Sequence, residues 1–461
     1  MAVILGMQAL LFARGLGAAA LFDEGVYLGS LDALRAGQQL GADVFAAQPP
    51  GFYFVLRAAA AVFGNTVDGV RTGVLVLGLL GSLGAYVALR VTVGAAAGLL
   101  GAALLVIAPP IPLYATRVLA DLPALDLVLL SLAAAALACS AGRASGRWAV
   151  AAGMLVMAAC SIKLSAAVAA PVVVLLLLRD RRRVNLVGAC AGAASVLAVV
   201  LLLNVRALPE LRASVIDYHQ QLRNFGSLER LGGPSPVQTL LDPRAAFTWL
   251  VVGAAALAVA HSVRDRRVRV SPFAVLACCG VALALLHRPL FEHHLVAVSV
   301  GFAVAAAEPL GRELAGTMGA RRMLLAGLVG LVIAGGYVQQ TRRVMTELPQ
   351  DDPSLAVDIA VLAQRTRPGD MVVSDQPILA YRARRSMPGN VIDTSYTRFV
   401  TGLLTDRDVL HAVDVDCAKA VVAGRTFITR PHLLREFERR FAVVERHPLA
   451  TVFFDRRVPC R

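Results

Sequence analysis

The chain has 461 residues, of which 57% are hydrophobic and 16% are charged, and its mean hydropathy is +0.67. This composition is too apolar for an ordinary soluble enzyme and indicates an integral membrane protein. The formal net charge of +14 raises the alternative of a nucleic-acid binder. Most basic residues, however, lie in short breaks between apolar segments, where they orient a membrane protein, so no nucleic-acid partner is expected.

Charge is unevenly distributed along the chain. The last 121 residues, from Thr341 onward, contain 34 charged side chains, whereas the first 340 residues contain 42. Such a shift in composition marks a domain boundary. We therefore expect a membrane-embedded unit at residues 1–340 and a water-soluble domain at residues 341–461, which is long enough to have its own core.

The first 340 residues divide into apolar segments separated by short charged breaks. Because a membrane-spanning helix needs about 20 apolar residues, the sequence predicts about eleven spans. The expected fold class is a polytopic α-helical membrane protein with a small C-terminal α/β domain. The predicted spans are 2–21, 70–89, 92–110, 122–141, 148–161, 164–178, 184–203, 245–262, 270–287, 294–310 and 323–340.

Alternate breaks between the predicted spans are rich in arginine, as at residues 179–183, 264–269 and 321–322. Basic loops of this kind face the cytoplasm. We therefore expect a multi-pass protein of the plasma membrane whose C-terminal domain is extracytoplasmic. The loops expected on the same outer side are 22–69, 111–121, 204–244 and 288–293.

An adjacent pair of acids, Asp23 and Glu24, follows the first predicted span. At the outer membrane surface, partial loss of solvent raises the pKa of a carboxylate and makes it a better general base. Alternatively, both acids cap the amphipathic helix expected at residues 25–39, because acidic groups are favourable at helix N-termini. Spacing alone favours capping.

Two further motifs lie on the expected outer side. Gln48 is followed by two prolines, which forbid a helix through this junction and indicate a rigid turn. Arg117 and Asp121 precede the fourth predicted span, one helical turn apart. They either pair with each other at the interface or face Asp23 across a shared cavity.

Lys163 interrupts a 31-residue apolar stretch that runs from Trp148 to Leu178. A lysine at mid-membrane costs about 2.5 to 3.5 kcal/mol on insertion scales. Two short helices with residues 160–165 as their outer turn are therefore more favourable than one long helix. Lys163 then reaches the outer surface, where it either binds a lipid phosphate or anchors the hairpin.

Another outer cluster, at residues 287–294, contains Arg288, His293 and His294. Histidine is the commonest metal ligand in proteins. Adjacent histidines on a helix point apart, however, so we assign no metal ligands here. A divalent cation is the one cofactor that stays in question.

The C-terminal segment has the pattern of a small α/β domain. It contains no GxGxxG or GxxxxGK[ST] motif, so nothing suggests nucleotide binding. Cys417 and Cys460 both lie in this domain and are candidates for a disulfide in an oxidising compartment. Its predicted helices are 354–365 and 433–441, and its predicted strands are 371–373, 420–422 and 451–454.

The order of these motifs resembles the C-type glycosyltransferase superfamily. The motifs are the acid pair after the first span, the proline pair about 25 residues later, an arginine and an aspartate before the fourth span, a lysine in a short hairpin, and a terminal α/β domain. The chain is similar to the bacterial relatives of the dolichyl-phosphate-mannose protein mannosyltransferases and of lipid A aminoarabinose transferase, which are glycosyltransferase family 39-like.

The resemblance implies transfer of a sugar from a polyprenyl phosphate to a lipid, glycan or protein acceptor on the outer face, with inversion. It implies that Asp23 is the general base, with Glu24 as its partner and Asp121 as a second acid. Arg117 and Lys163 are then candidates for binding the departing phosphate. Further substrate-binding residues are expected among Tyr27, Gln48, Arg288 and His293.

The chain departs from the aminoarabinose transferases at one motif. Those enzymes carry an acid and a base just before the proline pair, where this chain has Ala47 and Gln48. The change removes one phosphate-binding cation and argues against that particular substrate. Arg57 or Arg288 is available to replace it, and the sequence does not decide between them.

Two other classes of membrane protein remain as alternatives. A transporter or flippase of a lipid-linked or small anionic substrate would also be polytopic, but no inverted repeat is evident. A non-catalytic membrane scaffold or a polymer ligase is the other alternative. The partners expected for a transferase are the lipid-linked sugar donor, its acceptor and membrane lipid.

Overall fold

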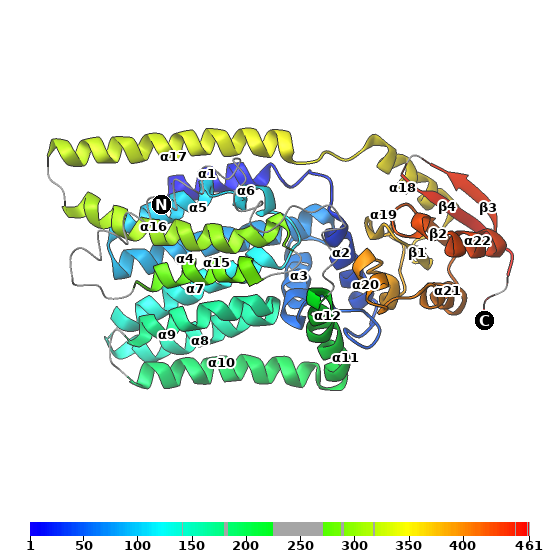
Figure 1. Cartoon of the computed structure of the whole chain (residues 1–461), viewed down its shortest axis with the longest axis horizontal. Helices are drawn as coiled ribbons and strands as arrows, with labels where there is room; N and C mark the ends of the chain where they lie inside the picture. The colour runs from blue at the N-terminus through cyan, green and yellow to red at the C-terminus, as the bar shows by residue number, and fades with distance from the viewer. Residues whose placement is uncertain are drawn as a thin grey trace.

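A computed structural model describes residues 1–140, 142–178, 183–224, 271–286, 290–316, 319–447, 449–458 and 460. The molecule is elongated, with a helical bundle and a smaller α/β domain lying end to end along its long axis (Figure 1). The C-terminus lies at the far end of the α/β domain. We call the two parts the membrane unit, which ends at Glu347, and the C-terminal domain, which begins at Pro353.

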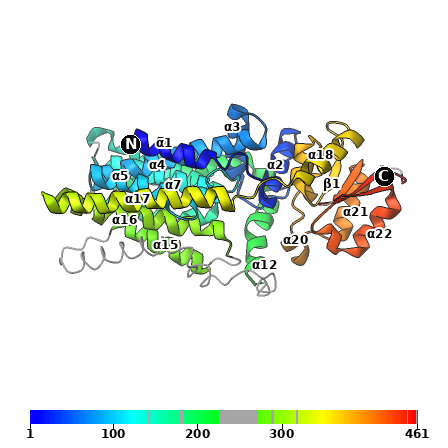
Figure 2. The ribbon, with the colours of Figure 1, turned by 90° about the horizontal axis from the view of Figure 1, so that it is seen from above.

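The membrane unit consists of apolar helices that run roughly along the long axis (Figures 1 and 2). Its helices are α1 (Ala2–Ala13), α4 (Val67–Thr92), α5 (Ala95–Ile107), α6 (Ile111–Tyr114), α7 (Asp121–Ser140), η1 (Gly142–Ala144), α8 (Ser145–Ile162), η2 (Leu164–Ala169), α9 (Ala170–Leu178), α10 (Arg183–Leu203), α15 (Pro272–Leu286), η7 (Glu292–Leu295), α16 (Val296–Gly316) and α17 (Ala320–Glu347).

A second set of helices lies between this bundle and the C-terminal domain (Figure 1). The two longest of the four loops expected to face outward, 22–69 and 204–244, contribute to this layer, the second as far as it is described. The layer contains α2 (Phe22–Arg35), α3 (Pro50–Phe63), η3 (Val205–Ala207), α11 (Leu208–Arg212), η4 (Ala213–Asp217) and α12 (Tyr218–Asn224).

Within the residues that the structure describes, six helices are long and apolar enough to cross a membrane, so the chain is a multi-pass membrane protein. They correspond to residues 67–92, 121–140, 145–162, 184–203, 292–316 and 320–347. The shorter apolar helices α1, α5, α9 with η2, and α15 coincide with four further predicted spans. The predicted span 245–262 lies outside the described residues, and the total of eleven spans stays a prediction.

Three boundaries differ from those predicted. The first helix ends at Ala13, because the chain turns there and runs irregularly to Phe22. Residues 50–63 form an apolar helix inside the predicted loop 22–69, since the proline pair starts a new helix at its N-terminus. Helix α17 continues past residue 340 to Glu347, and its last two turns are polar. A search for apolar residues alone does not detect those turns.

Small residues let the helices approach closely. A Cβ atom added at Gly84 would lie 2.8 Å from the backbone nitrogen of Leu130, and one at Gly153 would lie within 2 Å of the backbone oxygen of Ala189. Such contacts drive helix association where lipid provides no hydrophobic effect. By contrast, α10 and α17 lie on opposite sides of the bundle (Figure 1) and keep most of their apolar side chains exposed, as expected for lipid-facing helices.

The C-terminal domain has a four-stranded sheet of order β1-β2-β4-β3, with β1 and β2 parallel and the other pairs antiparallel. Helices cover both faces and give two apolar cores. Cys417 and Cys460 form a disulfide. The elements are α18 (Pro353–Arg365), β1 (Val372–Ser374), α19 (Pro377–Arg382), η8 (Gly389–Val391), α20 (Tyr396–Val400), α21 (Asp406–Val415), β2 (Ala420–Ala423), η9 (Phe427–Thr429), α22 (Pro431–Arg440), β3 (Phe441–Arg446) and β4 (Thr451–Arg456).

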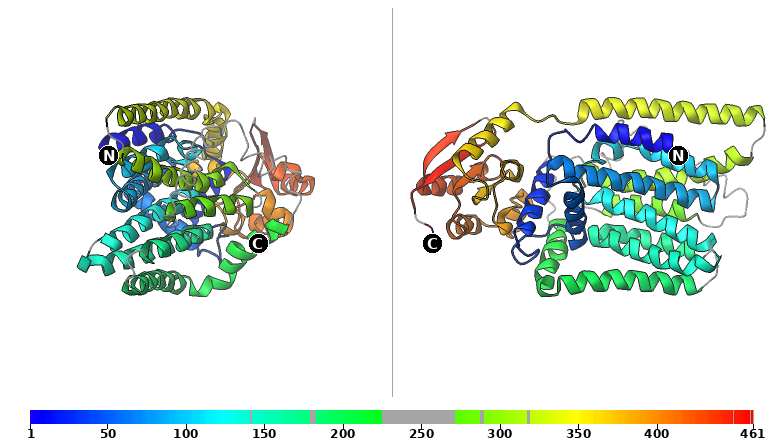
Figure 3. Two further views of the ribbon diagram at one scale, coloured as in Figure 1. Left: turned by 60° about the vertical axis from the view of Figure 1, so that its left-hand side comes forward. Right: turned by 180° about the vertical axis from the view of Figure 1, so that it is seen from behind.

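Helix α2 joins the two parts of the molecule, as the views from above and behind show (Figures 2 and 3). It packs against α19 through two glycines four residues apart. A Cβ atom at Gly25 would lie 2.8 Å from the backbone nitrogen of Ile378, and one at Gly29 would lie 3.1 Å from Cγ2 of Ile392. The C-terminal domain therefore rests directly on the helix that begins with Phe22 and Asp23.

Candidate active site

Polar side chains from four segments meet at the end of the bundle that faces the C-terminal domain. Asp23 lies in the first turn of α2, and Asp121 is the first residue of α7. Lys163 directly follows the last residue of α8, in the outer turn predicted for this hairpin. His293 belongs to the short 3₁₀ turn η7. The four residues lie at the same end of the bundle for one reason: each is next to the end of an apolar helix, where the chain enters or leaves the bundle.

Asp121 and Lys163 form the centre of this site. Their side chains make an ion pair with 2.6 Å between Lys163 Nζ and Asp121 Oδ1, and each side chain is slightly accessible to solvent, at 13% for Lys163 and 12% for Asp121. Both border a small open recess, which is otherwise lined mostly by apolar groups such as Leu125, Val168 and Leu283. The charged groups of Asp121 and Lys163 thus lie at the border of an apolar recess.

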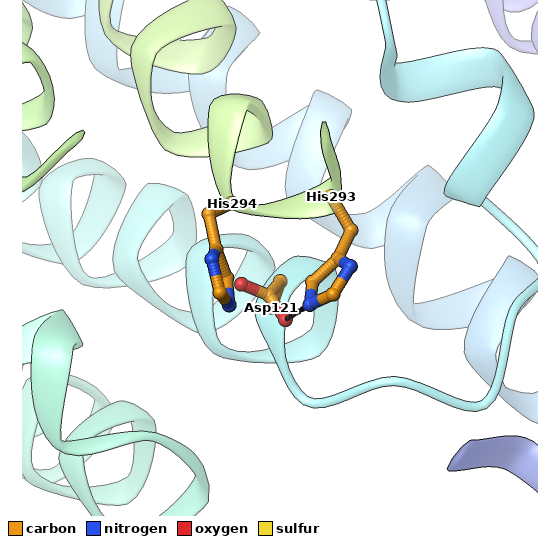
Figure 4. A group of neighbouring side chains, drawn as sticks. All are labelled: Asp121, His293 and His294. Carbon is orange, nitrogen blue, oxygen red and sulfur yellow. Dashed lines mark ion pairs between the residues drawn. The ribbon is translucent and has the colours of Figure 1, made fainter. Parts of the chain in front are cut away.

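Two histidines lie beside the same carboxylate. His293 Nε2 is 4.0 Å from Asp121 Oδ2, and the ring centroids of His293 and His294 are 4.2 Å apart. Both imidazoles lie on the side of η7 that faces Asp121 (Figure 4). The expectation that adjacent histidines point apart is wrong here, because both rings lie beside Asp121 in the short turn η7.

This histidine pair and Asp121 fit a metal ion in their chemistry and spacing. One ligand atom from each of the three residues lies within 4.8 Å of the other two. Two imidazoles and a carboxylate, with a fourth position open, are a donor set typical of catalytic zinc. The carboxylate oxygen that Lys163 contacts is the other one, Oδ1, so the ion pair does not occupy the oxygen nearest His293.

The side chain of Asp23 is accessible to solvent, but the membrane unit and the C-terminal domain surround it closely. Burial by the surrounding protein and the nearby negative charge of Asp393 raise the pKa of Asp23 to about 6, against the opposing effects of Arg425 and Lys163. A carboxylate of this kind is ionised near neutral pH and still accepts a proton readily. The geometry therefore suits a general base open to an incoming molecule.

Glu24 has a different environment from its neighbour. Its side chain is fully buried and takes hydrogen bonds from Arg71 Nε and Nη2 at 2.9 and 2.8 Å and from Arg117 Nη1 at 3.0 Å. Backbone N–H groups of Leu21 and Val118 also donate to it, at 2.9 and 3.0 Å. Burial alone would raise the pKa of Glu24, but the hydrogen bonds and charges of the two arginines outweigh it and lower that pKa.

These contacts correct two expectations. Glu24 does not share an open site with Asp23, since it caps its helix through Leu21 and binds two arginines. Arg117 does not pair with Asp121 and does not face the recess, because it is 2% exposed and is bound to Glu24 and to the backbone oxygen of Ala19. A phosphate-binding role for Arg117 therefore has no accessible surface to support it.

The remaining predicted positions fall in three groups. Gln48 Nε2 donates to the hydroxyl of Tyr27 at 3.1 Å, and the Tyr27 ring packs edge-on against Phe52 within the outer layer of helices. Arg57 is an exposed residue of α3. Arg288 lies outside the described residues.

Three residues near the site were not predicted. Arg71 completes the buried cluster around Glu24. Asp393 and Arg425 lie in the C-terminal domain, and both act electrostatically on Asp23. An arginine inside an otherwise apolar helix was a signal that pointed to Arg71, whereas the other two are ordinary charges in a charged domain and carry no local signal.

The chain has detectable similarity to one family model and to several solved structures. Residues 47–204 match the family model described as dolichyl-phosphate-mannose-protein mannosyltransferase. No curated protein sequence matches the chain.

Solved structures match over nearly the whole chain. ArnT from Cupriavidus metallidurans in the apo state is 17% identical, with 98% of this chain and 97% of that chain covered and a TM-score of 0.65. The same protein bound to undecaprenyl phosphate is 18% identical, with 98% and 96% covered and a TM-score of 0.67. The archaeal oligosaccharyltransferase AglB from Archaeoglobus fulgidus, in complex with an inhibitory peptide and a dolichol-phosphate, is 12% identical, with 92% and 69% covered and a TM-score of 0.57.

The predicted resemblance to the C-type glycosyltransferase superfamily is thereby confirmed, in that the chain has the fold of ArnT and AglB and its residues 47–204 match the family model of the dolichyl-phosphate-mannose-protein mannosyltransferases.

Proposed function

We propose that this protein is a membrane glycosyltransferase that moves a sugar from a polyprenyl-phosphate-linked donor to an acceptor on the extracytoplasmic face, with inversion at the anomeric carbon. One observation carries the proposal: the accessible carboxylate Asp23 and the Asp121–Lys163 pair meet at one end of the bundle, next to an apolar recess. The arginine-rich breaks in the sequence support the outer side of the membrane for this end, because basic loops are favoured on the cytoplasmic side.

Asp23 is the general base in this proposal. Its carboxylate takes the proton of the acceptor nucleophile as the acceptor oxygen bonds to the anomeric carbon. The bond between that carbon and the phosphate oxygen breaks on the opposite face, and its electron pair stays on the phosphate. Attack and departure on opposite faces invert the configuration.

Lys163 stabilises the departing phosphate. An ammonium group has three hydrogen-bond donors, so Lys163 can keep its bond to Asp121 while it contacts a phosphate oxygen. Fixed positive charge where negative charge develops lowers the barrier without reorganisation. Asp121 then has the role of orienting Lys163, and the apolar recess beside the pair is suited to the first isoprenoid units of the donor. Undecaprenyl phosphate is bound in one of the ArnT structures.

A divalent cation at Asp121, His293 and His294 is compatible with the same chemistry. When bound, it would supply a second positive charge close to the phosphate. The three residues would hold it beside the Asp121–Lys163 pair.

The acceptor is expected to enter between the outer helices and the C-terminal domain. Tyr218 of α12, in the described part of the loop 204–244, shares a hydrogen bond of 2.7 Å with Thr397 of the C-terminal domain. Phe45 packs edge-on against the Tyr218 ring and under the guanidinium of Arg398. Aromatic and polar groups of this kind suit a lipid headgroup, a glycan or a peptide as acceptor.

The test uses the full-length protein in liposomes that contain polyprenyl-phosphate-linked mannose, glucose or aminoarabinose, with cell-envelope extracts as acceptors. Asp23→Asn is expected to abolish transfer of radiolabel at unchanged protein abundance. Asp68→Asn is the matched control, because Asp68 is an exposed acid in the first turn of another helix, α4. Transfer by Asp23→Asn protein at the wild-type rate would refute this mechanism, and movement of donor across the bilayer without transfer would favour a flippase.

A further inference from the structure

Arg425 of the C-terminal domain reaches the start of the helix that carries Asp23. Its guanidinium carbon lies 4.0 Å from the ring centroid of Phe22, the residue before Asp23. A cation over an aromatic face is attracted by the ring and held in place. A positive charge from the far end of the chain is therefore fixed next to the candidate base.

The segment that presents Arg425 is built around a buried acid. Asp375 is fully buried and accepts hydrogen bonds from the backbone N–H groups of Gly424, Arg425 and Phe427, at 2.7, 2.9 and 2.6 Å. Three donors on one carboxylate fix the backbone of this turn. The position of the Arg425 backbone is thus determined by the core of the C-terminal domain and not by a loose loop.

Asp393 lies on the same side of the domain. The preceding residue, Ile392, contacts α2 at Gly29. Asp393 is 5% exposed, its Oδ1 accepts a hydrogen bond of 2.9 Å from the backbone N–H of Ser395, and its backbone oxygen binds Arg398. A negative charge is therefore also held against the face of the domain that rests on α2.

The contact between α2 and the C-terminal domain leaves no room for adjustment. Gly25 and Gly29 are on the same side of the helix, and a side chain at Gly25 would meet the backbone of Ile378. This close packing holds the start of α2, and with it Asp23, against the C-terminal domain.

We propose that Arg425 and Asp393 are positioning residues of the reaction centre, so that the C-terminal domain supplies part of the site and is not only a cover over it. The proposal rests on the assignment of Asp23 as the base under the proposed function. It extends the site to residues that neither the motifs nor the matched family segment include, since that segment ends at residue 204.

The physical effect is electrostatic. After burial, the negative charge of Asp393 is the largest influence that raises the pKa of Asp23, with a smaller one from Asp121. Arg425 and then Lys163 oppose it. A like charge disfavours ionisation and an opposite charge favours it. The two residues of the C-terminal domain therefore act in opposite directions on the proton affinity of the base.

The experiment measures that proton affinity in the full-length protein in lipid nanodiscs. The carboxyl signal of Asp23 is isolated by infrared difference spectroscopy against Asp23→Asn protein and is followed over pH. We expect Asp393→Asn to lower the midpoint, Arg425→Gln to raise it, and Arg425→Lys to restore it, because lysine keeps the charge. The proposal is overturned if Asp393→Asn and Arg425→Gln both leave the midpoint unchanged.

The same variants are assayed for sugar transfer over pH, so that the two proposals fail separately. Shifted midpoints with no transfer from any donor would contradict the proposed function alone. Normal transfer with unshifted midpoints would contradict the present inference alone.

Gly25→Ala adds a test that leaves every charge in place. It should separate α2 from the C-terminal domain, lower the midpoint of Asp23 and reduce transfer. Gly6→Ala is the control, since nothing lies within 4 Å of that added Cβ atom in helix α1. Equal midpoints and rates in these two variants would show that the contact does not set the site.

Discussion

Two clusters of acids and cations lie close together in the membrane unit, and they differ in how completely the acid is satisfied. Glu24 is fully buried and receives five hydrogen bonds from two arginines and two backbone groups. Asp121 pairs with Lys163 at a partly open position beside two histidines. An acid paired with cations is therefore a structural support in one cluster and part of a candidate reaction centre in the other.

The comparison teaches that accessibility, more than charge, separates a support from a site. A closed cluster has no surface left for a ligand, and removing one member leaves buried charges without partners. In an open cluster, a charged side chain can contact a substrate in addition to, or in place of, its partner in the protein. The variants below test that difference, from the largest expected effect to the smallest.

Replacing the closed acid should damage folding most. We expect Glu24→Gln to reduce the free energy of unfolding by about 3 to 5 kcal/mol, because it leaves Arg71 and Arg117 buried without a counter-charge. Thermal unfolding in detergent, followed by size-exclusion fluorescence, measures this. The matched variant is Asp121→Asn in the open cluster, which should unfold close to the wild-type temperature. Equal losses in both variants would remove the distinction between the clusters.

Replacing the open cation should damage catalysis and spare the fold. We expect Lys163→Met to lower kcat by about 10² to 10³-fold, the usual effect of removing one fixed group that stabilises developing charge. Lys163→Arg should retain part of the rate. Arg57→Met is the control, because Arg57 is an exposed cation on α3. A large loss in Arg57→Met with little loss in Lys163→Met would transfer the phosphate role to Arg57.

The rate should depend on the protonation of Asp23. A base acts when it is ionised, and the pKa of Asp23 is raised to about 6. The rate is therefore expected to be level above that pH and to fall about tenfold for each unit below it. Initial rates of transfer between pH 4.5 and 8.5 measure the profile. A level profile down to pH 4.5 would mean that Asp23 is not the base.

Changes at the histidines should have the smallest effect. If Asp121, His293 and His294 bind a metal, wild-type protein incubated with Zn²⁺ and desalted should retain one equivalent that the double variant His293→Ala/His294→Ala loses. Mass spectrometry of the metal content measures this. Activity should change less than in Lys163→Met, since Lys163 remains beside the phosphate. Equal zinc retention by both proteins would exclude the histidines as ligands.

The helices of the membrane unit were largely predictable, because their signal is local. Each predicted span within the described residues corresponds to an apolar helix. The turn at Lys163 was also correct, since a lysine in apolar surroundings forces a choice that the sequence alone can settle. Helix α3 was missed as an element of its own, because it lies in a loop defined by its charged neighbours.

The partners of the charged groups were not predictable in the same way. Arg117 was expected either to pair with Asp121 or to face Asp23 across a shared cavity, but it binds Glu24, which is distant in sequence and close in space. The histidines converge on Asp121 from a turn of four residues, η7, and no sequence pattern indicated how that turn directs their side chains. In the C-terminal domain the edge strand β3 was missed, since it is short and ends in two charged residues, the half-buried Glu445 and the exposed Arg446.

The Asp23 region also has a consequence for the order in which the protein is made. Asp23 leaves the ribosome before Asp393 and Arg425, and it meets them only after the C-terminal domain has folded against α2. A shorter nascent chain can insert its helices into the membrane, but it lacks the two charged residues that the proposed reaction centre takes from this domain.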